Sequence, residues 1–341
     1  MFKNPLAAFA LLLPVIALLL VTLQTRERPV DLLAEPAPWM QVPVVSRTAL
    51  APIPAPPEVD AEIRALGERL FHEPRLSRDG TVACASCHHL HTAGHDSRTH
   101  AMGIDGQVLP LNTPTVFNAA LHHAQFHDGR AATLEAQVAG PLHSPLEMDS
   151  SWDAAVAALE QDPSYLASFE KIYAEGITPA TIADAIASFE RTLLTPGARF
   201  DRYLLGNHNA LDEREKAGYA LFLQRGCASC HQGAAIGGNL FQRFGVMGDY
   251  YADRGDKAQP SPGRFAVTGR EEDRHVYKVP SLRNVALTGP YLHDGSVDSL
   301  SNVVALMGHY QLGLQLSPDE VELITLFLTT LTGSYRGVEL R

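Results

Sequence analysis

The amino-acid sequence predicts an all-α protein with two tandem units, long irregular loops between its helices and an apolar helix at its N-terminus. Apolar residues recur at helical spacing along most of the chain. The pentapeptide Cys-Ala-Ser-Cys-His occurs at 84–88 and again at 227–231, each time after a predicted helix. The length of 341 residues suffices for two modest domains, and the formal net charge of −11 argues against a nucleic-acid partner.

The N-terminal element, residues 1–25, contains an apolar run from Pro5 to Leu23. Its length fits either a secretory signal peptide or a single membrane-spanning helix. The sequence that follows, VTLQTRERP, has no small-x-small cleavage site, which favours an uncleaved signal-anchor. In both cases we expect the remainder of the chain to be exported.

A proline-rich segment, residues 26–58, follows this element and contains eight prolines. Such a composition favours extended backbone that resists packing, so the segment is interpreted as a linker between the membrane and the globular body. The alternative is a strand-like arm that packs on the body.

The globular body begins near Val59, and its first predicted helices, residues 61–71 and 212–225, precede the two pentapeptides. A break near Thr195-Pro196-Gly197 divides the body into two units, 59–195 and 196–341. The loops 92–114 and 232–275 are long for a compact domain, which indicates that they are functional, disordered or organised around something that is not protein.

Two further helices carry explicit start signals. Thr178 and Pro179 can cap and open a helix that contains Ile182, Ile186, Phe189 and Leu193. The run Ser317-Pro318-Asp319-Glu320 supplies a cap, a proline and a capping-box glutamate before Val321, Ile324, Leu328 and Leu331.

All four cysteines of the chain lie in the two pentapeptides, and each copy ends in a histidine. Cys-x-x-Cys-His is the attachment signature of c-type haem, in which two thiols bond to the porphyrin and the histidine binds the iron. A single zinc site built from both cysteine pairs, or disulfides, would leave the two histidines unexplained. The predicted haem-binding residues are Cys84, Cys87, His88, Cys227, Cys230 and His231.

The stretches LNTPTVFNAALHHAQFHDGRAATLEAQVAGPLHSPLEM, KVPSLRNVALTGPYLHDGS and ALMGHYQLG resemble the bacterial di-haem cytochrome c peroxidases. This family also includes the MauG-type enzymes, which mature a protein-derived quinone. The resemblance covers the chain from about Leu66 to Gly333. It implies a peroxidatic haem in residues 59–195 and an electron-transfer haem in residues 196–341.

The resemblance also implies an activity: reduction of hydrogen peroxide to water, with electrons from a small c-type cytochrome or another periplasmic donor. The expected location is the periplasm, with a tether to the inner membrane if the N-terminal helix stays uncleaved. A homodimer is one assembly to consider. The alternatives are MauG-like oxidation of a protein side chain, or a di-haem electron carrier that is not an enzyme.

Specific residues match the family's site. Met307 matches the distal methionine of the second haem, where a thioether would raise the iron's potential and fill its sixth position. The quinone-maturing enzymes carry a tyrosine there; by spacing alone Met307 would be a core residue. Gln137 and Glu147 match the distal residues of the first haem, with Glu147 as the proton shuttle and Gln137 orienting peroxide.

The sequence departs from the family at two positions. Many members carry Gly-His-Gly after the first haem, and that histidine blocks the iron, whereas this chain has Ile104. We therefore expect an open first iron in the resting protein, unless His91, His95 or His100 replaces the missing ligand. His127 stands where the family usually has tryptophan between the haems, and an imidazole is harder to oxidise.

The resemblance further implies a calcium ion between the two units. Its ligands map onto the Asn112 side chain and the main-chain carbonyls of Thr288 and Pro290. One amide and two carbonyls, completed by water, suit a hard cation.

Overall fold

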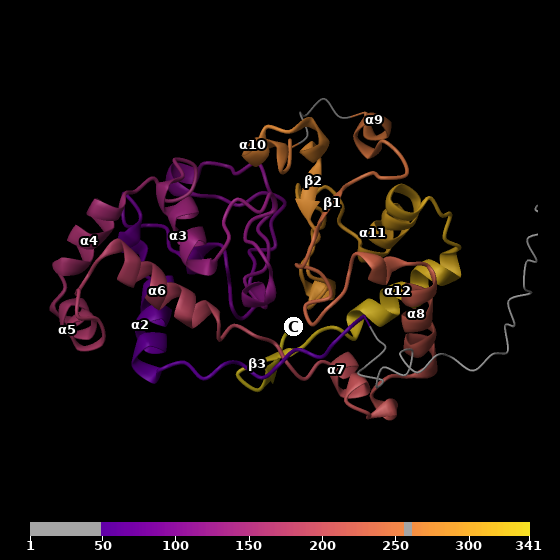
Figure 1. Ribbon diagram of the computed structural model, residues 1–341, viewed down its shortest axis with the longest axis horizontal. Helices are drawn as coiled ribbons and strands as arrows, with labels where there is room; N and C mark the ends of the chain where they lie inside the picture. Colours follow the sequence, from indigo (N-terminus) through magenta and orange to yellow (C-terminus); the bar gives the residue numbers. More distant parts are fainter. Residues whose placement is uncertain (1–48, 256–260) are drawn as a thin grey trace, which may run out of the picture. The chain divides into compact units, whose positions relative to one another are not determined.

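A computed structural model describes residues 49–255 and 261–341 (Figure 1). The predicted N-terminal helix, residues 1–25, and most of the predicted linker lie outside the described residues. Within the described ranges, no helix is both long and apolar enough to cross a bilayer.

Helices dominate the described chain, as predicted, and four short strands form two antiparallel pairs, β1 with β2 and β3 with β4. The helices are α2 (Ala61–Phe71), α3 (Leu134–His143), α4 (Trp152–Glu160), α5 (Pro163–Ile172), α6 (Pro179–Glu190), α7 (Arg199–Leu204), α8 (Glu213–Gln224), α9 (Tyr250–Arg254), α10 (Phe265–Thr268), α11 (Leu300–Leu306) and α12 (Pro318–Thr329). The strands are β1 (Phe241–Arg243), β2 (Val276–Lys278), β3 (Ser334–Tyr335) and β4 (Val338–Glu339).

The predicted helix starts are confirmed at the level of individual hydrogen bonds. Thr178 caps α6 by accepting the amide of Thr181, and Ser317 forms a complete capping box with Glu320 at the start of α12. The segment predicted as a loop, 232–275, contains three short elements: β1, α9 and α10.

Two helix pairs form the centres of two hydrophobic cores: α2 packs on α6, and α8 packs on α12 (Figure 1). Each pair crosses at a glycine. A Cβ atom added at Gly67 would lie 1.9 Å from the carbonyl oxygen of Ala185, and one added at Gly218 would lie 2.0 Å from that of Leu323. In both halves of the body, residues 59–195 (the first lobe) and 196–341 (the second lobe), the two helices therefore pack with backbone against backbone.

The likeness of the two lobes extends well beyond the pentapeptides. Asn118 and Asn284 both adopt left-handed backbone, with φ of 62° and 60°. The turns that follow contain His-Asp-Gly in both lobes, at 127–129 and 293–295, and each is closed by one antiparallel bridge. The two lobes therefore repeat the same turns in the same order, as an internal duplication would.

The two ends of the described chain cross to opposite cores. The first described residues, 49–53, run as an arm on the second core, where Leu50 is buried and bridges to Gly233. At the other end, Leu340 and Tyr335 pack on the first lobe, with the Tyr335 ring 5.0 Å from Phe117. The last part of the predicted linker is therefore a packed arm, the alternative that the sequence left open.

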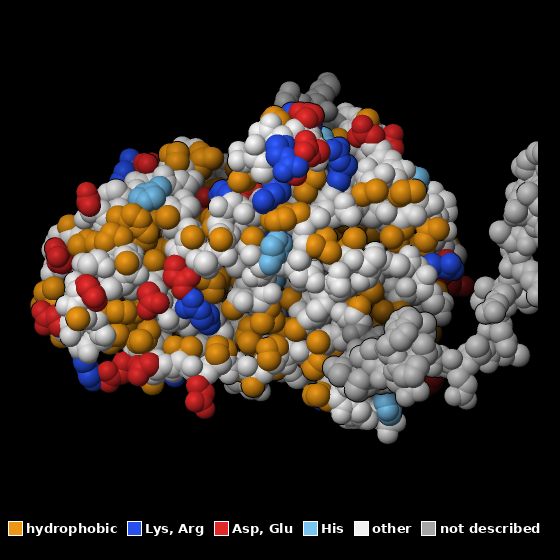
Figure 2. Space-filling model, in the orientation of Figure 1, with side chains coloured by type: hydrophobic (Ala, Val, Ile, Leu, Met, Phe, Trp, Pro, Cys, Tyr) orange, Lys and Arg blue, Asp and Glu red, His pale blue; other side chains and the backbone are white. Residues whose placement is uncertain are grey.

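Charged side chains are interleaved on the face shown in Figure 2, where basic groups gather above the α10 segment. Arg270 pairs with Glu272, and Arg274 pairs with Glu271. Because these pairs are solvent-exposed, they contribute little to stability, and they largely neutralise this basic cluster.

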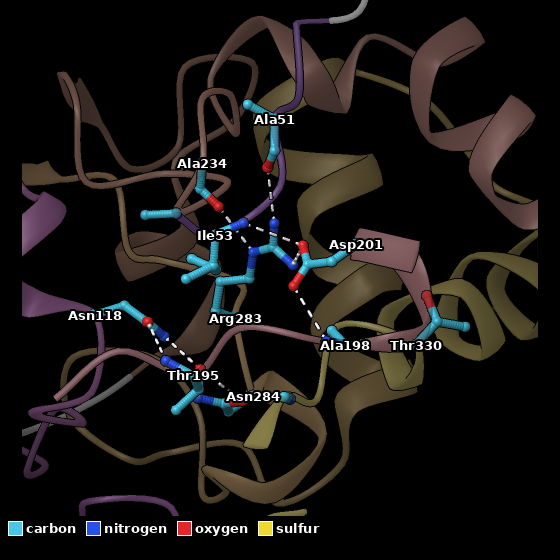
Figure 3. A network of polar contacts seen from close by, with 12 residues as sticks. Ala51, Ile53, Asn118, Thr195, Ala198, Asp201, Ala234, Arg283, Asn284 and Thr330 are labelled. Carbon is cyan, nitrogen blue, oxygen red and sulfur yellow. Dashed lines mark hydrogen bonds and ion pairs between the residues drawn. The ribbon is translucent and has the colours of Figure 1, made fainter. Parts of the chain in front are cut away.

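A buried ion pair fixes the arm to the second lobe (Figure 3). The guanidinium of Arg283 is completely buried and lies 2.7 Å from the Asp201 carboxylate. Arg283 also donates to the carbonyls of Ala51 and Ala234, both at 2.8 Å, while Asp201 accepts the amide of Ile53. Removing one member of such a buried pair is costly, because the other charge is left buried without a counter-charge.

We expect Asp201→Asn to destabilise the protein by about 3–5 kcal/mol, because it leaves the Arg283 guanidinium buried without a counter-charge. Guanidinium titration of the purified protein measures the change. Glu322→Gln is the matched control, since it removes the partner of Arg214 in an exposed pair, and it should shift the unfolding midpoint little. Equal, small shifts in both variants would contradict the role given to the buried pair.

Candidate haem sites and catalytic pocket

The two pentapeptides fold into the same short turn. In each copy a single turn of 3-10 helix covers Cys-Ala-Ser, at Cys84–Ser86 and Cys227–Ser229. The amide of the closing histidine, His88 or His231, donates to the carbonyl of the first cysteine at 3.0 Å. All four cysteines are free thiols. The sequence identity of the copies is therefore matched by identical local structure.

Both histidines are held in the form that binds iron. The Nδ1–H of His88 donates to the carbonyl of Gly94 at 3.2 Å, and that of His231 to Ile236 at 3.4 Å. Fixing the proton on Nδ1 leaves the lone pair of Nε2 for a metal. Burial lowers the pKa of both imidazoles, to about 4 for His231, so both are neutral at pH 7.

These donor sets fit two separate c-type haems, each with a thiol pair and a neutral imidazole on one turn. The zinc alternative needs both cysteine pairs on one ion. Among the described residues, which include all four cysteines, no cluster of three or more histidine, cysteine, aspartate or glutamate side chains could hold a metal. The structure therefore gives the zinc interpretation no support.

The loop with Ile104 packs directly on the segment with Glu147. The amide of Ile104 donates to the carbonyl of Glu147 at 2.8 Å, and the Ile104 side chain is completely buried. A Cβ atom at Gly103 would lie 1.9 Å from the carbonyl oxygen of Leu146. The Sγ atom of Cys87 lies 4.0 Å from the carbonyl of Met102 in the same loop. These contacts bring the loop, Glu147 and the first pentapeptide together.

Glu147 has the electrostatic setting of a proton shuttle. Burial raises the pKa of its carboxyl group, although a hydrogen bond from Ser144 and the charge of Arg130 oppose that effect. Burial, with smaller contributions from nearby carboxylates that include Glu147, also raises the pKa of both Cys84 and Cys87. Glu147 is therefore electrostatically close to the first haem-attachment site.

Gln137 lies half-buried on α3, the helix that leads into the Glu147 turn. The amide of Met148 folds back to the carbonyl of Pro141 at 3.2 Å, which fixes this turn against the end of the helix. Gln137 and Glu147 do not hydrogen-bond to each other in the described structure. The two predicted distal residues thus share one helix-turn unit without direct contact.

The three histidines that could replace a blocking ligand differ sharply in their environment. His95 is buried with both ring nitrogens engaged, Nε2 with the carbonyl of Leu287 at 2.8 Å and Nδ1 with the amide of Ser97 at 3.1 Å. His91 is exposed and stacks on His89. His100 has a buried Nδ1 without a hydrogen-bond partner. Of the three, only His100 combines burial with a free nitrogen.

Met307 lies where α11 widens into a π-helical turn, Met307–Gln311. Such turns occur frequently at functional sites, because the extra residue redirects a side chain. Val304, one turn earlier, packs in the second core with Phe222, whose ring lies 6.5 Å from that of His231. Met307 therefore caps a helix that is anchored in the core beside the second predicted haem ligand.

One hydrogen bond links Asn112, a residue predicted to hold calcium, to the loop that carries the other two, Thr288 and Pro290. The Asn112 side-chain amide donates to the carbonyl of Arg98 at 2.6 Å, and its main-chain amide donates to the carbonyl of His293 at 3.0 Å. The latter bond ties Asn112 to the loop that carries Thr288 and Pro290. His127 also lies here, with Nε2 3.4 Å from the carbonyl of Asn112.

One buried carboxyl group near the first site has no counterpart in the sequence-based predictions. Glu190 is the last residue of α6, and burial raises its pKa to about 8. Its charge also contributes to the raised pKa of Cys84. In the helical pattern of α6, Phe189 is an apolar position and Glu190 is an ordinary polar one. The sequence pattern therefore does not predict that Glu190 is buried.

Comparison with known proteins agrees with this geometry. Residues 61–209 match the family model described as di-haem cytochrome c peroxidase. The chain is 46% identical over 285 residues to cytochrome c peroxidase Ccp of Escherichia coli, covering 83% of this chain and 61% of that protein. It is 44% identical to cytochrome c551 peroxidase of Nitrosomonas europaea, covering 83% of this chain and 84% of that one.

Among solved structures, the fold is similar to that of a MauG-like protein associated with microbial copper homeostasis. The TM-score is 0.71 at 30% sequence identity, and the match covers 83% of this chain and 93% of the other. The duplicated Cys-x-x-Cys-His turns and these similarities lead to one conclusion. The chain belongs to the di-haem cytochrome c peroxidase family.

Proposed function

We propose that this protein reduces hydrogen peroxide to water, with electrons that arrive one at a time from a small c-type cytochrome or another periplasmic donor. The observation that carries the proposal is the half-buried Glu147 carboxyl group, whose pKa burial raises and whose segment packs on the loop with the buried Ile104. A simple electron carrier has no use for such a group. The relatives named above as peroxidases support the same activity.

Two covalently attached haems would be held by the two pentapeptides, with Cys84, Cys87 and His88 in the first and Cys227, Cys230 and His231 in the second. When bound, the irons supply a binding position for peroxide and a store for single electrons. The thiols are unpaired and the imidazoles are neutral, which is the state in which they can take up these groups.

Glu147 would move the proton that the reaction requires. As a carboxylate it accepts the proton from the near oxygen of peroxide, and as a carboxylic acid it returns that proton to the departing oxygen. The raised pKa of its carboxyl group suits both roles, since the protonated form is less costly in a poorly hydrated pocket. The Gln137 amide would orient peroxide by hydrogen bonding.

Met307 would be the sixth ligand of the second haem. The π-helical turn and the anchoring of α11 in the second core support this role. A thioether raises the reduction potential of the iron and closes it to peroxide, which suits electron entry. Because this position holds methionine, MauG-like oxidation of a protein side chain is the less favoured activity.

A calcium ion held by the Asn112 side chain and the carbonyls of Thr288 and Pro290 would join the two lobes. The main-chain bond from Asn112 to His293 supports this, since it brings the amide to the loop with the two carbonyls. Export to the periplasm and anchoring by residues 1–25 complete the proposal, supported by the apolar run there.

Glu147→Gln should lower peroxide turnover by about 10²–10⁴, the usual contribution of a general acid–base group. In the native protein, turnover should fall as the pH drops through the raised pKa of Glu147, because the protonated group cannot accept a proton. The variant should lack this acidic limb. The control is Glu160→Gln, at an exposed position on α4; full activity in both variants would place the proton shuttle elsewhere.

Met307→Leu should lower the reduction potential of the second haem and slow turnover, because leucine cannot bind iron. Redox titration and steady-state peroxide consumption measure the two effects. Met247→Leu is the matched control: Met247 is 60% exposed, and its amide bonds to the carbonyl of Tyr310 in the same π-helical turn. An unchanged potential in Met307→Leu would refute the axial assignment.

The fully oxidised protein should show a high-spin ferric signal from the first haem and react with peroxide without prior reduction. The reason is that Ile104 has no lone pair and His95 has no free nitrogen. Ile104→His should convert this signal to low spin, whereas His100→Ala should leave it unchanged. A low-spin resting spectrum that becomes high-spin in His100→Ala would identify His100 as the ligand instead.

A further inference from the structure

We propose that four tyrosines of the second lobe, Tyr277, Tyr251, Tyr250 and Tyr310, form a chain that supplies electrons when the external donor is absent. The inference rests on the proposed peroxidase function. Peroxide then withdraws electrons from tyrosine, and the oxidising equivalent travels along the chain to the surface. Met307 and the haems are thereby spared oxidation.

The rings follow one another at contact distance. The hydroxyl groups of Tyr277 and Tyr251 lie 3.1 Å apart. The ring of Tyr251 lies 5.5 Å from that of Tyr250, which lies 5.2 Å from that of Tyr310. Electron transfer between side chains falls off steeply with distance, so rings in contact allow a series of short steps. Neighbouring rings at such distances are also attractive in their own right.

One end of the chain shares a turn with Met307, and the other lies on a strand that leads toward the segment after His231, so the chain ends near both axial ligands proposed for the second haem. Tyr277 is on β2, and the strand leads to Pro280, whose carbonyl packs against Gly237, the residue after the Ile236 whose carbonyl binds the His231 ring. Tyr310 is in the π-helical turn that Met307 opens. The chain therefore connects the two sides of one electron-transfer site through protein.

The inner end also reaches the junction of the lobes. The ring of Tyr277 stacks on His293 at 4.3 Å, with 22° between the planes. The carbonyl of His293 accepts the amide of Asn112, whose own carbonyl lies 3.4 Å from His127. His127 itself is a poor store for an oxidising equivalent, because an imidazole is harder to oxidise than a phenol. The stacked tyrosine offers the easier site.

The geometry supplies an acceptor for each proton that must leave. The hydroxyl of Tyr251 lies 3.5 Å from Nε2 of His293, and the hydroxyl of Tyr310 donates to the Asp253 carboxylate at 3.3 Å. A phenol that loses an electron becomes strongly acidic, so a neighbouring base is needed for a stable neutral radical. Tyr251 and Tyr310 both have one.

The step balances as follows in atoms and electrons. Reduction of one hydrogen peroxide to two waters consumes two electrons and two protons. Tyr251 and Tyr310 each lose one electron to the haems, and their phenolic protons move to His293 and Asp253. Two neutral tyrosyl radicals remain, and the two protons that peroxide consumes come from solvent. Each radical is restored by one electron from a small one-electron reductant such as ascorbate, which meets the chain at Tyr310, and it takes back the proton held by His293 or Asp253.

The test uses the full-length, haem-loaded protein mixed with hydrogen peroxide and no donor, then frozen for EPR. The native protein should give a tyrosyl radical signal. That signal should be lost in the double variant Tyr251→Phe/Tyr277→Phe, while peroxide turnover with ascorbate and a redox mediator stays unchanged. Peptide mass spectrometry after repeated peroxide additions should show oxidation moving from tyrosine to Met307 in the double variant.

Tyr219→Phe is the matched control, because Tyr219 and Tyr277 are both 8% exposed and Tyr219 packs in the second core outside the chain. It should keep the radical signal. The single variant Tyr251→Phe keeps the ring and removes only the hydroxyl between Tyr277 and His293, so it tests the chain without disturbing packing.

The outcomes separate the two proposals. An equal radical signal in the native protein and the double variant overturns the tyrosine chain. Turnover with ascorbate and mediator but no tyrosyl signal in the native protein also overturns it and leaves the peroxidase function intact. Absence of turnover under every condition would instead refute the peroxidase function.

Discussion

A single buried threonine joins the two halves of this protein. Thr195 lies between the lobes, where its hydroxyl accepts the side-chain amides of Asn118 at 2.9 Å and Asn284 at 3.1 Å. Its own amide donates to the Asn118 side chain at 3.0 Å, and Gly333 donates to that of Asn284. Both asparagines are fully buried, so every polar atom here must find a protein partner or carry a large desolvation cost. The network therefore fixes the two asparagine turns against the segment that contains Thr195.

The chemistry of both lobes depends on this alignment. Each asparagine turn leads into a His-Asp-Gly turn, and the two turns bring His127 and the His293 main chain to the same residue, Asn112. The Asn112 main chain bridges them through one hydrogen bond to each side. The proposed calcium site and the inner end of the tyrosine chain lie at this same junction. Because electron transfer slows steeply with distance, a small shift between the lobes would change the rate of each step along the tyrosine chain.

The sequence predicts best where the signal is local. The capping box of Ser317 and the start of α6 at Thr178 are encoded within a few residues, and the structure confirms both. It predicts poorly where the signal is tertiary. The burial of Glu190 and the packing of the arm at Leu50 come from contacts with distant segments, which periodicity does not record.

The functional difference proposed between the lobes corresponds to one helix in each repeat. α3 and α11 follow the two His-Asp-Gly turns and are capped by Thr133 and Ser299 in the same way. Counted from these caps, Pro141 in α3 occupies the position of Met307. Proline has no atom that can bind iron, so this helix offers the first lobe no thioether ligand, and its chain turns back to present Glu147 instead. In the proposed arrangement, the duplicated frame therefore offers the second iron a thioether ligand and offers the first iron none at the same position.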